Sequence, residues 1–139
     1  MSTPLTAVCG LWPTPRRLVA VVEREGRMGN AASIMRTTEA RWGFVVWLSA
    51  SGVGTMVTTD ALAADSLLGI AREEGLHVWL APAGLVDAVR AAAALTRRAP
   101  RHTAALLARW PAQSVLRQHL RHLPPADTSA TSVRQLHLW

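Results

Sequence analysis

The order of strand-like and helical segments is the feature that most limits what this chain can fold into. Three β-prone stretches come first, at 5–11, 18–23 and 28–36. Helices and strands then alternate: helix 40–48, strand 55–59, helix 61–74, strand 76–80 and helix 82–95. The first three strands predict an antiparallel meander, and the alternation that follows predicts parallel pairing with right-handed crossovers. The sequence therefore predicts an α/β domain with a five-stranded mixed sheet flanked by helices.

Residue types at the segment ends support these boundaries. Asp60 directly precedes the segment 61–74, where its carboxylate is predicted to cap the first free amides of a helix. Gly75 follows the same segment and suits the left-handed conformation that ends many helices. Two further helices are predicted, at 101–110 and 113–123.

The size and composition fit one domain. The chain has 139 residues, half of them hydrophobic, which is enough to build one core. We expect the domain to occupy residues 1–123 and a polar, turn-rich tail to follow at 124–139, whose last residues, 136–139, are apolar enough to dock on it. Because the chain has no Tyr and a single Phe, we expect the core to consist mainly of Ala, Val and Leu, with the six Trp as its large side chains.

The charge balance is strongly basic. All 15 basic residues are Arg, the net charge is +6 and the isoelectric point is near 11.6. The absence of Lys, beside so much Ala, is typical of a GC-rich genome, but the positive field still favours polyanions such as nucleic acid or acidic protein surfaces. The single Cys9 cannot form an internal disulfide and is predicted to be buried and inert. Because no export leader and no membrane-spanning apolar stretch are evident, we expect a cytoplasmic protein without membrane contact.

Three short motifs carry a family resemblance. Cys9-Gly10-Leu11-Trp12 ends the first predicted strand, Thr59-Asp60-Ala61 follows the fourth, and Ala-Pro-Arg-His-Thr-Ala at 99–104 opens a helix. In order and spacing, residues 8–107 resemble the amino-terminal domain of RuvC-like DEDD transposases of bacterial insertion sequences. The resemblance implies a ribonuclease H-like fold with the element order β-β-β-α-β-α-β-α. The acidic positions of that family fall here on Trp12, Asp60, Pro100 and Thr103.

This loss of acidic residues determines the functional expectation. Phosphodiester cleavage by two divalent ions needs several clustered carboxylates, and Asp60 alone cannot hold such a pair of ions. We therefore expect a catalytically inactive domain, not an enzyme, with no bound metal and no cofactor; residual metal-dependent nuclease activity is the least favoured alternative. No small-molecule substrate is indicated.

Other candidate sites are weaker. His119 and His122 lie three residues apart on a predicted helix, but no acid or Cys joins them, so a surface pair is favoured over a metal site. His77 lies in an apolar strand and is expected at its end or in the core. Asp65 is expected to be a solvated helix residue. The segment 51–54 has two Gly but lacks the longer phosphate-binding pattern, and is predicted to be a turn.

Two functional hypotheses remain. The first is a domain that binds nucleic acid or serves a mobile genetic element, with phosphate contacts from late arginines. These are Arg97, Arg98, Arg101, Arg109, Arg117 and Arg121, and Arg90 belongs to the same late run of basic residues.

The alternative is a protein-interaction or homodimeric assembly module. The Ala-rich segments 91–95 and 104–107 form small apolar faces suited to close helix packing. Three Trp are expected in the core, at 47, 79 and 110, whereas Trp12 and Trp139 lie near turns or ends where exposure would favour a partner.

Overall fold

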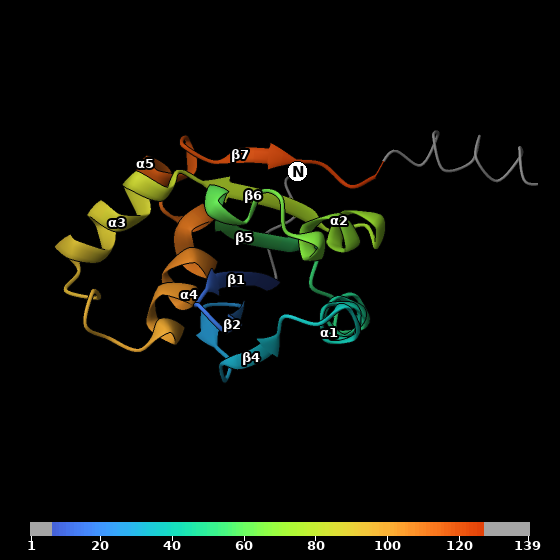
Figure 1. The fold of residues 1–139 in the computed structure, drawn as a ribbon. Helices are drawn as coiled ribbons and strands as arrows, with labels where there is room; N and C mark the ends of the chain where they lie inside the picture. The colour runs from blue at the N-terminus through green and yellow to red at the C-terminus, as the bar shows by residue number, and fades with distance from the viewer. Residues whose placement is uncertain (1–6, 127–139) are drawn as a thin grey trace, which may run out of the picture.

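The computed structural model describes residues 7–126, which form a single mixed sheet with helices on both faces (Figure 1). The predicted docking of residues 136–139, Trp139 included, lies outside the described residues. The strands are β1 (Ala7–Pro13), β2 (Arg17–Arg24), β3 (Arg27–Met28), β4 (Ala32–Met35), β5 (Thr55–Thr59), β6 (His77–Ala81) and β7 (Arg121–Leu123). The α-helices are α1 (Thr38–Ala50), α2 (Ser66–Glu73), α3 (Ala83–Ala92), α4 (Pro100–Arg109) and α5 (Ser114–Arg117).

The sheet has the order β3-β2-β1-β5-β6-β7, and β4 also pairs with β2. The pairs β1–β2, β2–β3 and β2–β4 are antiparallel, whereas β1–β5 and β5–β6 are parallel. The antiparallel meander, the parallel half and the α/β fold class are confirmed, but the sheet of the described residues has seven strands where five were predicted.

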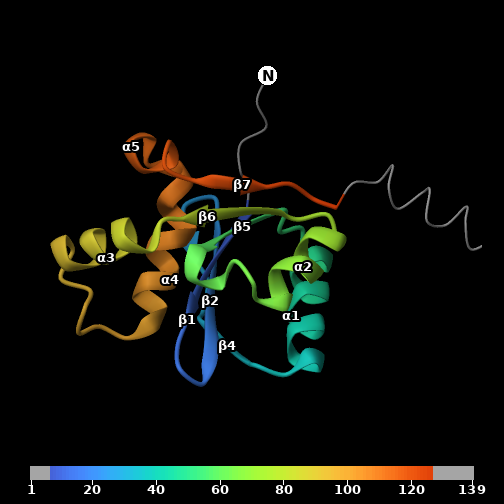
Figure 2. The same ribbon diagram turned by 45° about the horizontal axis from the view of Figure 1, so that its top comes forward.

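Two apolar layers hold the helices against the sheet. On one face, Cys9, Leu11 and Met56 of the sheet pack under α1 and α2. On the other face, Val8 and Val57 lie under α3 and α4, together with Trp110, which is fully buried. The residues alternate between these layers along each strand, so β1 and β5 are buried on both sides. Figure 2 shows the sheet almost edge-on between the two helical layers.

Close packing of α4 on β1 depends on Gly10. A Cβ atom built on Gly10 would lie 1.8 Å from the carbonyl oxygen of Ala104 and 2.5 Å from the amide nitrogen of Ala108. The backbone of α4 therefore rests directly on the strand, with no side chain between them.

The segment predicted as one helix at 61–74 is divided. A short 3₁₀ turn, Asp60–Leu62, comes first, and α2 begins only after Asp65, whose Oδ1 accepts a hydrogen bond from the Leu67 amide at 2.8 Å. Asp65 is not a solvated residue, since Arg41 donates to both of its oxygens. Burial alone would raise the pKa of Asp65, but the hydrogen bonds from Arg41 and the Leu67 amide, with the charges of Arg41 and Arg36, hold that pKa below its ordinary value. Gly75 has φ +88 and ends α2 as predicted.

Three further details differ from the prediction. The third strand is divided into β3 and β4, because residues 29–31 interrupt the pairing with β2. The predicted helix 113–123 is the single turn α5 followed by β7, which adds an antiparallel edge strand to β6. Trp47 is not in the core, because 51 % of it is exposed on α1. Among the described residues, no helix is long and apolar enough to cross a membrane.

Candidate functional site

The carboxyl ends of the parallel strands form the candidate site. Gly10 of β1 lies opposite Val57 of β5, so two residues further along Trp12 comes beside Thr59, the neighbour of Asp60. In open α/β sheets, ligands bind outside the carboxyl ends of the parallel strands. Two of the four positions that the transposase resemblance singled out, Trp12 and Asp60, therefore share this edge of the sheet.

The guanidinium group of Arg90 connects Trp12 with Thr103. Its central carbon lies 4.7 Å from the centroid of the Trp12 ring, and its Nε donates to the Thr103 hydroxyl oxygen at 3.0 Å. Thr103 is buried on α4, and Pro100 stands one helical turn earlier, at the exposed first position of that helix. The sequence analysis grouped Arg90 with the late basic residues, but its contact with Trp12 was not predicted, since nothing in the sequence relates the two residues.

Asp60 has a different partner from the one predicted. The hydroxyl of Thr59, and not the carboxylate of Asp60, caps the 3₁₀ turn that follows β5. Oδ1 of Asp60 instead accepts a hydrogen bond from the Ala83 amide, at 3.1 Å, in the first turn of α3. Because Pro82 has no side-chain acceptor for that turn, Asp60 supplies the cap of α3 from another strand.

The donor set of this edge does not suit a divalent metal ion. Of the four positions only Asp60 has a carboxylate, and one of its oxygens already accepts from Ala83. Within residues 7–126, no group of three or more His, Cys, Asp or Glu side chains could hold a metal ion.

The six predicted phosphate-binding arginines do not form one patch. Arg97 and Arg98, between α3 and α4, and Arg101 in the first turn of α4 are exposed near the carboxyl edge of the sheet. Arg109 lies at the opposite end of α4, where its Nε is 3.4 Å from Oε2 of Glu23. The remaining two, Arg117 and Arg121, are exposed on α5 and β7.

Two arginines that the sequence analysis did not select join the first group. Arg16 and Arg17 are exposed at the turn that follows β1, directly beyond Trp12. Figure 2 shows this turn and the α3–α4 connection at the same end of the molecule. We call Arg16, Arg17, Arg97, Arg98 and Arg101 the carboxyl-edge arginines. The sequence signal for Arg16 and Arg17 was their position directly after a predicted strand that ends near Trp12, a candidate site residue.

The histidines are arranged differently from the prediction. His119 and His122 are not on one helix, because His122 lies in β7. Its Nε2 is 2.9 Å from Nδ1 of His77, and its ring stacks on Trp79 with the centroids 4.1 Å apart. Burial and the charge of His77 both lower the pKa of His122. Cys9 is buried as predicted, and this burial raises the pKa of its thiol to about 12.

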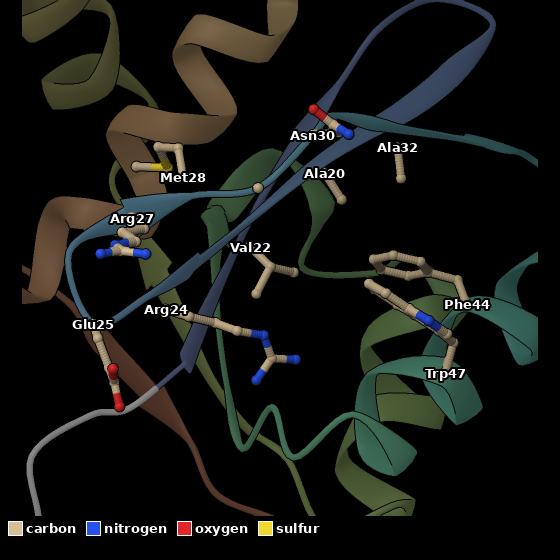
Figure 3. Close-up of a pocket in the computed structure, with 11 residues that line it drawn as sticks. Ala20, Val22, Arg24, Glu25, Arg27, Met28, Asn30, Ala32, Phe44 and Trp47 are labelled. Carbon is tan, nitrogen blue, oxygen red and sulfur yellow. The ribbon is translucent and has the colours of Figure 1, made fainter.

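A separate hollow lies between α1 and the outer strands. It has a volume of about 780 Å³ and is lined by Val22, Arg24, Met28, Phe44 and Trp47, among others. Figure 3 shows the Phe44 and Trp47 rings side by side on α1, facing the strands, with the Arg24 side chain extended toward the same space.

Comparison with known proteins identifies the fold. No protein-family model matches the sequence, and no curated protein matches it. Among solved structures, that of Thermus thermophilus RuvC is similar, with a TM-score of 0.58 and 15% identity over 84% of this chain and 99% of RuvC. The fold is ribonuclease H-like. The structure of T. thermophilus RuvC in complex with a Holliday junction substrate is similar to the same degree, with a TM-score of 0.58 and 16% identity over 85% of this chain and 99% of that chain.

This comparison corrects one expectation. The sequence predicted that the chain is not an enzyme, because acidic residues are missing at Trp12, Pro100 and Thr103. The fold is, however, shared with RuvC, which was solved with a substrate bound. The missing carboxylates therefore do not establish inactivity, and the prediction that the chain is not an enzyme is wrong.

Proposed function

We propose that the chain is a nucleic-acid-binding domain and that DNA, branched DNA first of all, lies across the carboxyl edge of its sheet. The observation that carries this proposal is the shared fold with RuvC in complex with a Holliday junction, joined to the carboxyl-edge arginines. Phosphate contacts of this kind position DNA without recognising its sequence.

The charges at this edge support backbone binding. Arg97 and Arg98 are exposed on a connection between two helices, and Arg101 follows in the next turn, so the three guanidinium groups project from a short stretch of chain. Asp60 has one oxygen occupied by the Ala83 amide at the start of α3, and Asp87 on α3 lies near Arg90. Positive charge predominates there, as contact with DNA phosphates requires.

Fluorescence anisotropy with labelled four-way junction, duplex and single-stranded DNA tests the proposal. We expect binding that weakens with salt, with a slope of log affinity against log salt concentration of about −0.9 for each phosphate contacted. The variant Arg97→Ser/Arg98→Ser should weaken binding of every DNA and lower the magnitude of that slope by about two.

The matched control is Arg27→Ser/Arg109→Ser, which removes the same charge from β3 and from the far end of α4. We expect it to bind DNA as the unaltered chain does. If both double variants lose DNA affinity equally, the loss comes from the lower overall charge and not from the carboxyl edge. If the unaltered chain binds no DNA at low salt, the proposal is refuted.

A second candidate function is homodimerisation through α1. Trp42, Val46 and Trp47 are exposed on this helix, and Met35 of β4 is exposed beside it. Isolated exposed apolar residues are normal, but several large ones on one helix, beside an open hollow, favour a protein partner.

The charges around this helix favour a second copy of the chain as that partner. Glu39 is exposed in the first turn of α1, whereas Arg24 lies beyond the last turn and donates to the Ser51 carbonyl oxygen at 2.7 Å. Two antiparallel α1 helices about a two-fold axis would therefore place Glu39 of each copy near Arg24 of the other. Sedimentation should show a dimer that Trp42→Gln/Trp47→Gln converts to a monomer; a monomeric unaltered chain at high concentration would exclude this candidate.

The expected role in a mobile genetic element, and the expected cytoplasmic location, are supported only by the sequence and stay predictions.

A further inference from the structure

Arg90 is held in place from three elements. It projects from α3, its guanidinium lies over the Trp12 ring of β1, and its Nε donates to the Thr103 hydroxyl of α4. Nη1 also lies 3.6 Å from Oδ1 of Asp87, one turn earlier on the same helix. The group is thus oriented before any ligand arrives, which lowers the entropy cost of binding.

Some N–H groups of this guanidinium have no partner among the described residues. Of its five N–H groups, the structure uses Nε–H on Thr103, and the Asp87 carboxylate lies near Nη1. Within residues 7–126, Nη2 has no hydrogen-bond partner, and 20% of the Arg90 side chain remains exposed. A planar pair of such donors matches two oxygens of one phosphate.

This guanidinium also stands among positions where the transposase resemblance implied a metal site. Mg²⁺ needs several hard anionic oxygens, and of those four positions only Asp60 has a carboxylate. A fixed cation between Trp12 and Thr103 adds repulsion to that deficit. The residues of this edge therefore suit an anion better than a divalent cation.

We propose that Arg90, held by Trp12 and Thr103, binds a backbone phosphate of DNA directly and without a divalent cation. This inference rests on the proposed nucleic-acid binding and specifies where one phosphate lies and what neutralises it. The positive charge that a metal ion would bring to a phosphate here comes from the guanidinium group.

The test is DNA binding by the full chain, measured by anisotropy at fixed ionic strength with millimolar Mg²⁺ or with EDTA. We expect the same affinity in both conditions. Arg90→Ala should lose at least about tenfold in affinity, the size expected for one hydrogen bond to a charged group. Arg90→Lys should not restore it, because an ammonium group lacks the planar set of donors that lets the guanidinium bond Thr103 and a phosphate while it lies over Trp12.

Two further variants separate the site from general folding effects. Trp12→Phe keeps an aromatic face under the guanidinium and should retain most of the affinity, whereas Trp12→Ser should behave like Arg90→Ala. Arg109→Ala removes an arginine from the far end of α4 and should bind as the unaltered chain does. Circular dichroism and the melting temperature of each variant show whether it is folded at the assay temperature.

The outcomes are distinct. If the unaltered chain binds DNA but Arg90→Ala binds equally well, or if EDTA abolishes binding, the role of Arg90 is refuted while nucleic-acid binding stands. If the unaltered chain binds no DNA at low salt, nucleic-acid binding itself fails.

Discussion

Replacing Gly10 by Ala is the most severe test of how β1 and α4 fit together. The added methyl carbon would lie 1.8 Å from the Ala104 carbonyl oxygen and 2.5 Å from the Ala108 amide nitrogen. Even a close C–H···O contact needs about 3.3 Å between carbon and oxygen, so α4 would have to retreat by about 1.5 Å. Both obstructing atoms belong to backbone, and no side-chain rotation can relieve the clash.

The expected cost follows from that geometry. Overpacking a core costs about 1–3 kcal/mol where side chains can adjust, and we expect at least the upper value where a helix backbone must move. At roughly 4 °C per kcal/mol for a domain of this size, the melting temperature of Gly10→Ala should fall by at least about 12 °C. Retreat of α4 would also draw Thr103 away from Arg90, so DNA affinity should fall with stability.

Urea unfolding followed by circular dichroism measures the difference. The matched control is Gly69→Ala in α2, where an added Cβ meets no atom within 4 Å. Since Ala is favoured over Gly inside a helix, this control should gain about 0.5–1 kcal/mol. Equal free energies of unfolding for Gly10→Ala and the unaltered chain would refute the close approach of α4 to β1.

Three further predictions concern single side chains. Asp65→Asn should lose about 1 kcal/mol at neutral pH, because Asp65 caps α2 and pairs with Arg41. Since folding lowers the pKa of Asp65, this stability is present above the unfolded pKa and is lost as the pH falls through the folded pKa. The urea unfolding curves of the variant and the unaltered chain should therefore converge in acid. Cys9, buried with a pKa raised to about 12, should not react with a thiol reagent at neutral pH until denaturant is added, and rapid labelling of the folded chain would contradict its burial. Trp110→Ala should lose about 3–5 kcal/mol, because the indole is fully buried and its Nε1 donates to the Leu116 carbonyl oxygen; calorimetry showing a loss below 1 kcal/mol, about the size of a surface effect, would contradict this.

The elements that the sequence predicted well are those with local causes. Buried strands such as 55–59 contain runs of β-prone residues, and Gly75 marks a helix end because glycine adopts at little cost the positive φ that this position requires. These signals act within a few residues, so they can be recognised without knowledge of the neighbouring elements.

The elements that were missed depend on distant contacts. β7 consists of three residues, and its pairing with β6, where His122 stacks on Trp79, is invisible to local pattern. Trp47 was placed in the core because it is large and apolar, but the side of α1 that faces the sheet is fixed by Phe44, Val45 and Leu48.

The candidate site divides in the same way. Trp12 and Asp60 could be placed at one edge, because the carboxyl ends of neighbouring parallel strands meet there. The contact of Arg90 with Trp12 could not, since α3 and β1 are far apart in sequence and only the packed fold brings them together.

The hydrogen bond from the Ala83 amide to Asp60 has a consequence for how this protein is studied. Asp60 is the last carboxylate at the acidic positions and the obvious target for a knock-out, yet it also anchors the start of the helix that carries Arg90. An Asp60→Asn protein that lost DNA binding would resemble a protein deprived of its metal ligand, although the displaced group would be a guanidinium on α3. Only comparison with Arg90→Ala, in the presence and absence of Mg²⁺, separates the two causes.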